Sequence, residues 1–236
     1  MKAAVYFGSH HIYDDMLTSA KSLLANSDVD KIYFLIEDNE FPYPLPDCIE
    51  VRNIRFVVPK IFDQNNPNYN TRWTYIGLIR AALTKVFPEL DIVLSIDCDA
   101  IVDKDISDLW MLPMDSYYIA AAKEPVLTSV RHMLYTNSGV TLFNLKKMRE
   151  DNIDNEMIYA LNMRKYTFVA QDVLNLFCQN HILEISSDYN ACDYTNRTNN
   201  PKVIHYAGKS DWREDEVVKK YREMPWNEVR SGLCVT

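Results

Sequence analysis

The chain has 236 residues, which is long for one small domain and short for two large ones, so its length predicts a single domain with a modest appendage. Apolar residues make up 47% and charged residues 25%, a balance that fills a core and argues against disorder. The formal net charge of −8 excludes broad sequence-independent binding to nucleic acid, because that binding depends on many lysines and arginines facing phosphates.

The first part of the chain alternates predicted strands and helices. A short apolar run, Ala3–Phe7, predicts a buried strand. The apolar residues that follow recur at helical spacing, with Asp14 or Asp15 as the cap of the helix. Lys31–Ile36 predicts the next buried strand, and Ile49–Val58 contains another.

The middle and the end of the chain continue the alternation. Apolar spacing over Asn70–Phe87 predicts a long helix that Pro88 terminates. The run Asp91–Ile96 predicts a strand that ends directly before Asp97. Further strands are predicted at Tyr117–Ala121 and Gly139–Phe143, and further helices at Lys146–Leu161, Gln171–Cys178 and Glu214–Glu223. This pattern predicts an α/β fold, with helices flanking a mainly parallel sheet and ligands bound at the carboxyl ends of its strands.

Five cysteines lie far apart and form no CxxC pair, which predicts neither a disulfide framework nor a zinc site and favours a reducing cytosol. No segment is apolar over the length needed to span a bilayer, and the N-terminus turns polar too soon for a signal peptide. We therefore expect a cytoplasmic protein. The C-terminal segment mixes acids and bases around Trp226, which predicts at most a weak contact with a membrane surface.

Asp97 and Asp99 are the first candidates for a functional site. They lie two residues apart immediately after a predicted buried strand, and side chains at that spacing point to the same side of an extended chain. Two close carboxylates repel each other unless a cation lies beside them, and Mg²⁺ or Mn²⁺ prefers such hard oxygen ligands. A solvated turn is the alternative interpretation of an Asp-x-Asp pair.

Four sequence blocks in order carry a family resemblance. They are Ile92–Val102 around the two aspartates, Asn137–Leu145, Gln171–Asn175 and His205–Gly208. On these blocks the chain resembles the retaining glycosyltransferases of family 8, which have the GT-A fold and include glycogenin and bacterial lipopolysaccharide galactosyl- and glucosyltransferases. The resemblance implies a Rossmann-like GT-A domain over residues 1–212, followed by a C-terminal helical extension over residues 213–236.

The resemblance implies a metal site and a reaction site. It adds His205 to Asp97 and Asp99 as the third ligand of a Mn²⁺ or Mg²⁺ ion, although a lone histidine is also typical of a structural residue. It places Gln171 on the reacting face of the sugar with Asp172 beside it, where an aspartate can also simply complement the dipole of its helix. The family usually has an Asp before the Gln, and here that position is Ala170.

Further residues are expected to bind the donor. Arg80 lies on the inward face of the predicted helix, so it either pairs with a structural carboxylate or, as the resemblance implies, reaches the donor diphosphate or sugar. The resemblance likewise places Asn137 and Ser138 in the sugar pocket, although turn residues before a strand also fit a plain loop. The bare Gly139 allows close approach of the backbone.

The two ends of the expected domain complete the donor site. Gly8 lies in the loop that, by resemblance, grips the uridine, and Tyr13 matches the aromatic residue that stacks on uracil, while the acidic residue of that loop is missing. Gly208 allows the backbone to approach the phosphates. The family continues with Lys-Pro-Trp, but this chain is one residue shorter before Trp212, and Lys209 is the lysine left to assist the leaving diphosphate.

The resemblance therefore implies a retaining glycosyltransferase that moves glucose or galactose from a UDP-sugar to a saccharide or glycoconjugate acceptor. A phosphatase is a rival, but its Asp-x-Asp follows the first strand, whereas here nearly a hundred residues precede the motif. A sugar-phosphate nucleotidyltransferase needs a glycine-rich basic loop near the N-terminus, where Gly8 stands alone. The Ala170 and Lys209 departures keep a third alternative open, a nucleotide-sugar-binding protein that has lost activity.

Overall fold

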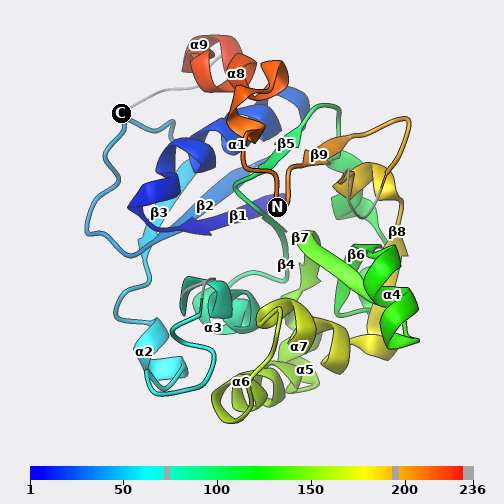
Figure 1. Ribbon diagram of the computed structural model, residues 1–236. Coiled ribbons are helices and arrows are strands. Elements are labelled where there is room, and N and C mark those ends of the chain that lie inside the picture. Colours follow the sequence, from blue (N-terminus) through cyan, green and yellow to red (C-terminus); the bar gives the residue numbers. More distant parts are fainter. Residues whose placement is uncertain (72–74, 193–196, 231–236) are drawn as a thin grey trace.

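A computed structural model describes residues 1–71, 75–192 and 197–230. Its central sheet has seven strands in the order β3-β2-β1-β4-β7-β6-β8 (Figure 1). Only β7 runs antiparallel to its neighbours, so the expected α/β fold with a mainly parallel sheet is confirmed. The strands are β1 Ala3–Gly8, β2 Lys31–Ile36, β3 Ile49–Asn53, β4 Ile92–Ile96, β6 Ile119–Lys123, β7 Thr136–Asn144 and β8 Ile182–Ile185. A separate antiparallel pair joins β5 Ala100–Val102 to β9 Val203–His205.

Helices cover both faces of the sheet (Figure 1). The helices on one side are α1 Tyr13–Asn26, α8 Glu216–Glu223 and α9 Trp226–Val229. Those on the other are α2 Val58–Ile61, α3 Leu83–Val86, α5 Leu145–Glu150, α6 Ile153–Met163 and α7 Ala170–Phe177, and α4 Pro125–Arg131 follows β6. Short 3-10 turns are His10–Ile12, Tyr75–Ala82, Ser107–Met111, Met114–Ser116, Gln179–His181, Ser187–Asn190 and Trp212–Glu214.

The sheet divides the interior into two apolar cores. Along β1, Ala3 and Val5 pack into the core under α3, α5, α6 and α7, while Ala4 and Tyr6 pack into the core under α1. Successive strand residues point to opposite faces, so a strand that is buried on both sides must be apolar throughout. This explains why the inner strands could be predicted from continuous apolar runs.

Two predicted helices were wrong in form. The described part of Asn70–Phe87 contains a 3-10 segment followed by the short α3, and residues 72–74 of that prediction lie outside the described residues. Nearly every side chain of the 3-10 segment is buried, so no exposed face repeats at the α-helical period, and Gly77 weakens an α-helix further. The predicted helix 146–161 is broken into α5 and α6 at Asn152, which has the left-handed φ of 60°.

The C-terminal helices pack on α1. The buried carboxylate of Asp15 accepts hydrogen bonds from Arg213 Nε at 3.0 Å and Arg222 Nη2 at 3.2 Å. Asn26 Nδ2 donates to the hydroxyl of Tyr221 at 2.7 Å. These contacts attach α8 to the rest of the chain, whereas the division at residue 212 stays a prediction, and residues 231–236 lie outside the described residues.

Within the described ranges, no helix has both the length and the apolar character that crossing a bilayer requires. Cys48, Cys98, Cys178 and Cys192 are free thiols, and Cys234 lies outside those ranges.

We expect Asp15→Asn to destabilise the protein by about 2 kcal/mol, because two arginines lose the charge of a buried acceptor. Urea unfolding of the full chain measures this change. Asp28→Asn is the matched control, since Asp28 pairs with Lys2 at an exposed position and its loss should destabilise the protein much less. Equal destabilisation by the two variants would contradict the role assigned to Asp15.

Candidate functional site

The candidate site forms where β4 ends and β5 begins. Asp97 follows the last residue of β4, and Asp99 precedes the first residue of β5. β5 pairs antiparallel with β9, and this register places His205 directly opposite Ala100, the neighbour of Asp99. A histidine from the end of the chain is thereby brought to two aspartates from its middle.

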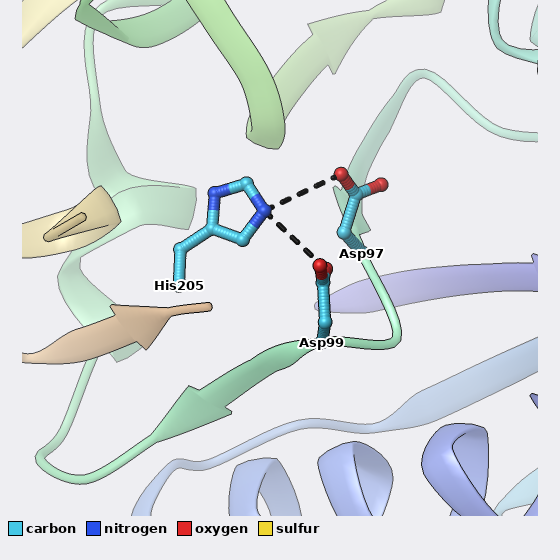
Figure 2. A group of neighbouring side chains, drawn as sticks. All are labelled: Asp97, Asp99 and His205. Carbon is cyan, nitrogen blue, oxygen red and sulfur yellow. Dashed lines mark ion pairs between the residues drawn. The ribbon is translucent and has the colours of Figure 1, made fainter. Parts of the chain in front are cut away.

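The three side chains converge on one point (Figure 2). His205 Nε2 lies 3.6 Å from Asp97 Oδ2 and 3.3 Å from Asp99 Oδ1. One ligand atom from each residue falls within 4.8 Å of the other two, and the described residues contain no other such group of three or more histidine, cysteine or acidic side chains. Two carboxylates and an imidazole are ligands suited to a divalent cation, so this donor set fits a metal site.

The charges of the cluster shift its pKa values. Burial by itself lowers the pKa of His205, but the charges of Asp99 and Asp97 and the hydrogen bond to Asp99 outweigh it and raise the pKa to about 9. Burial raises the pKa of Asp99, yet the charge and hydrogen bond of His205 outweigh it and hold the pKa below its ordinary value. Positive charge near the two carboxylates therefore stabilises them. A proton on the imidazole or a divalent cation supplies that charge.

Arg80 joins the cluster from the 3-10 segment. Its buried guanidinium forms an ion pair with Asp97 Oδ1 and donates from Nη1 to Ser138 Oγ at 2.9 Å. The guanidinium carbon also lies 4.7 Å from the centroid of the Phe7 ring. Arg80 therefore pairs with a carboxylate that belongs to the candidate metal site rather than to a separate structural pair, and its contact with the donor stays a prediction.

Ser138 carries the network on to Gln171. The Ser138 amide and hydroxyl both donate to Gln171 Oε1, at 3.0 and 3.1 Å. Gln171 Nε2 faces the hydroxyl of Tyr135 at 3.4 Å. Asn137 and Ser138 lie inside β7, so the alternative of a plain loop before the strand is wrong for both residues. Strand β7 begins at Thr136, three residues before the apolar run Gly139–Phe143 from which the strand was predicted.

Asp172 is buried and held by several donors. Its Oδ1 accepts from the Tyr135 hydroxyl at 2.7 Å and pairs with Arg131 Nη2 at 2.7 Å, and its Oδ2 accepts from the Phe168 amide at 2.9 Å. Val169, directly before α7, has φ of 44°, which a β-branched residue adopts only under strain of about 1–3 kcal/mol. The strained turn and the three donors fix the first turn of α7, from which Gln171 faces β7.

Gly8 and Tyr13, the two residues predicted to bind the uridine of the sugar donor, lie at the end of β1 and at the start of α1. Gly8 ends β1, where an added Cβ would come within 2.5 Å of Ile12 Cδ1. Tyr13 is buried, donates its hydroxyl to Asp38 Oδ2 at 2.8 Å and packs its ring 4.8 Å from that of Phe41. Their contacts with a base stay predictions.

A cavity of about 490 Å³ borders the cluster on the side of His205. Lys209 and Tyr206 line it, and Lys209 Nζ lies 5.6 Å from the centroid of the Tyr206 ring. Gly208 adopts φ of +76° in the turn between them, a conformation that favours glycine. The cavity gives Lys209 space in which to meet a ligand.

Gly139 leaves room for the ring of His205. A Cβ at Gly139 would lie 2.1 Å from Cε1 of His205 and 2.6 Å from Nδ1, closer than real atoms approach. The imidazole thus occupies the space that a side chain at residue 139 would fill. Sequence reasoning predicted close backbone approach here, but it did not identify the partner.

Sequence reasoning also missed Asn190, Tyr135 and Arg131. Asn190 contacts the ring of His205, and the other two hold Asp172. Tyr135 lies two residues before the Asn137–Leu145 block, which was its only sequence clue. Asn190 and Arg131 lie outside every apolar pattern and every motif, so only the tertiary structure identifies them.

Two solved glycosyltransferases share this fold. The galactosyltransferase LgtC, solved in complex with donor and acceptor sugar analogues, superposes with a TM-score of 0.73 at 18% identity over 95% of this chain and 98% of that one. GlyE of Streptococcus pneumoniae TIGR4 gives 0.72 at 20% identity over 97% of this chain and 62% of that one. This likeness shows the fold of the chain, which is the GT-A fold.

The sequence comparison specifies the family. The model of glycosyl transferase family 8 matches residues 16–216, and the chain belongs to that family. GlyA, a glycosyltransferase of Streptococcus pneumoniae serotype 4, is 24% identical over 95% of this chain. The chain spans 34% of the length of GlyA, so it corresponds to about a third of that curated relative.

We expect Gly139→Ala to weaken divalent-cation binding at least about 10-fold, because the new Cβ displaces the imidazole of His205. Calorimetric titration with Mn²⁺ and Mg²⁺ measures the affinity, and thermal melting confirms folding. Gly208→Ala is the control: at φ of +76° it costs backbone strain and should lower the melting temperature, but its Cβ meets no atom within 4 Å, so His205 keeps its place and the affinity should stay unchanged. Unchanged affinity in a folded Gly139→Ala protein would refute the packing role.

Proposed function

We propose that this chain transfers glucose or galactose from a UDP-sugar to a saccharide or glycoconjugate acceptor with retention of configuration. The observation that carries the proposal is the continuous network from the Asp97, Asp99 and His205 cluster through Arg80 to Gln171, in a chain of glycosyl transferase family 8. The acidic cluster at one end of this network suits the metal-bound diphosphate of a nucleotide sugar. The side-chain amide of Gln171 at the other end suits the sugar.

The donor diphosphate binds at the cluster. Asp97, Asp99 and His205 would hold Mn²⁺ or Mg²⁺, which would supply positive charge beside the departing diphosphate. Lys209 adds positive charge from the adjoining cavity, which suits the same leaving group. Gly208 lets the backbone of the turn approach the phosphates without a side chain in the way.

The sugar lies between Arg80 and Gln171. Arg80 keeps Asp97 and Ser138 in fixed positions, so it orients the cluster toward the β7 block as well as adding charge. Asn137 already accepts two hydrogen bonds through Oδ1, from Gly139 N and Asn190 Nδ2, and therefore offers its Nδ2 to a sugar hydroxyl. Tyr13 and the Gly8 loop bind the uracil end of the nucleotide.

Retention proceeds by attack of the acceptor on the same face that the diphosphate leaves. A covalent route requires a carboxylate free to reach the sugar, but Asp172 is buried and tied to Tyr135, Arg131 and the Phe168 amide. Gln171 is a poor nucleophile whose Oε1 accepts two hydrogen bonds from Ser138. Gln171 therefore faces the oxocarbenium-like centre as a dipole, and Asp172 positions the turn that holds it.

We expect Asp99→Asn to lower UDP release from UDP-glucose or UDP-galactose at least about 100-fold, because the cation loses a charged ligand beside the leaving group. UDP release is measured with both donors, with Mn²⁺ and with EDTA, and EDTA should stop the wild type. Asp103→Asn, just beyond β5, is the control, because Asp103 is not part of the cluster. Nucleotide binding without release from either donor would favour a binding protein that has lost activity.

We expect Asp172→Asn to lower the rate about 10-fold while product retains its configuration, since Asn keeps the shape of the carboxylate but weakens its contact with Arg131. Loss of a covalent nucleophile would instead cost about 10⁴-fold or more. Initial rates, NMR of the product anomer and mass spectrometry of the intact protein separate the two cases. A glycosylated Asp172 would overturn same-face attack.

A further inference from the structure

A chain of three hydrogen bonds leads from the backbone of β7 to the ring of His205. The Gly139 amide donates to Asn137 Oδ1 at 2.8 Å, and Asn190 Nδ2 donates to the same oxygen at 3.0 Å. Asn190 Oδ1 lies 2.8 Å from His205 Nδ1. Asn190 and His205 are both buried, at 1% and 4% exposure, so these contacts are protected from water.

The first of these hydrogen bonds decides which atom donates and which accepts in the other two. A backbone N–H can only donate, so the Asn137 atom facing Gly139 must be the carbonyl oxygen. The Asn190 atom facing that oxygen must then be the amide nitrogen, which turns the carbonyl oxygen of Asn190 toward the ring. That oxygen only accepts, so Nδ1 of His205 carries a proton. The other nitrogen, Nε2, is the one that faces Asp97 and Asp99 (Figure 2).

We propose that Asn190 is the positioning residue that fixes His205 with its proton on Nδ1 and the lone pair of Nε2 directed at the metal position, and that Asn137 fixes Asn190. Metal-binding histidines commonly donate their second ring N–H to a partner that sets the tautomer and the ring orientation. The usual partner is a carboxylate or a carbonyl, and here it is a side-chain amide whose own orientation is set by a backbone amide. The inference rests on the proposed metal site.

Two substitutions at residue 190 test the chain of hydrogen bonds. Asn190→Leu removes the acceptor for Nδ1–H at similar volume, and it should weaken Mn²⁺ binding about 10- to 100-fold. Asn190→Asp keeps an acceptor for Nδ1–H and should retain most of the affinity, although it loses the bond to Asn137. Mn²⁺ is titrated into the full chain, alone and with UDP, and the free ion is followed by electron paramagnetic resonance.

A spectroscopic measurement separates positioning from general destabilisation. Protein labelled with ¹⁵N-histidine is loaded with diamagnetic Cd²⁺, and the His205 signals are assigned by their loss in His205→Gln. The wild type and Asn190→Asp should show a proton on Nδ1 and none on Nε2, and Asn190→Leu should lose this pattern. A proton on Nε2 in the wild type, or equal Mn²⁺ affinity in the wild type and a folded Asn190→Leu, overturns the inference.

A second pair of variants applies if Asn190→Leu does not melt cooperatively. Asn137→Asp keeps the oxygen that accepts from Gly139 and Asn190, whereas Asn137→Leu removes that acceptor and with it the constraint that Asn137 places on the orientation of the Asn190 amide. Only Asn137→Leu should give a mixture of the two His205 tautomers, one with the proton on Nδ1 and the other with the proton on Nε2. Finally, metal-free wild type at a pH where the imidazole is neutral should still carry its proton on Nδ1. If it does so yet binds no Mn²⁺, the proposed metal site fails and the positioning by Asn190 stands.

Discussion

The site depends on the concentration of negative charge at the end of β4. Asp97 and Asp99 are held close to each other, and their repulsion must be offset by cationic groups that the fold brings to them. Asp97 contacts both Arg80 and His205. The arrangement that makes the two carboxylates costly to fold also leaves part of their surface open, since the Asp97 and Asp99 side chains keep 30% and 33% exposure. Close carboxylates that stay accessible are a donor set that fits a divalent cation.

Backbone geometry provides the room for this arrangement. The β5–β9 pair sets His205 across from Ala100, and the missing side chain of Gly139 lets the imidazole lie against β7. Gly139 thus acts twice, because its amide also starts the hydrogen bonds that orient Asn137 and Asn190. One residue of β7 therefore controls both where the histidine lies and which nitrogen faces the aspartates.

The network beyond the cluster separates groups that can meet a substrate from groups that hold them. Gln171 is partly exposed and its Oε1 is fixed by Ser138, whereas Asp172 is buried under Tyr135 and Arg131. Adjacent residues on α7 therefore have different environments, and these environments favour a positioning role for the acid. In many enzyme sites a few side chains face the reacting atoms, and buried neighbours hold those side chains in position.

The sequence by itself determined the class of fold, because strands buried on both faces must be apolar throughout, as in β1, β2 and β4. It also identified Asp97, Asp99 and His205 as a set, through motifs that resemble a family. The 3-10 form of the Arg80 segment, the break at Asn152 and the partners Asn190, Tyr135 and Arg131 were decided by the tertiary structure. Local patterns record which residues are buried, whereas the direction of a hydrogen bond or the space left by Gly139 depends on residues that are distant in the chain.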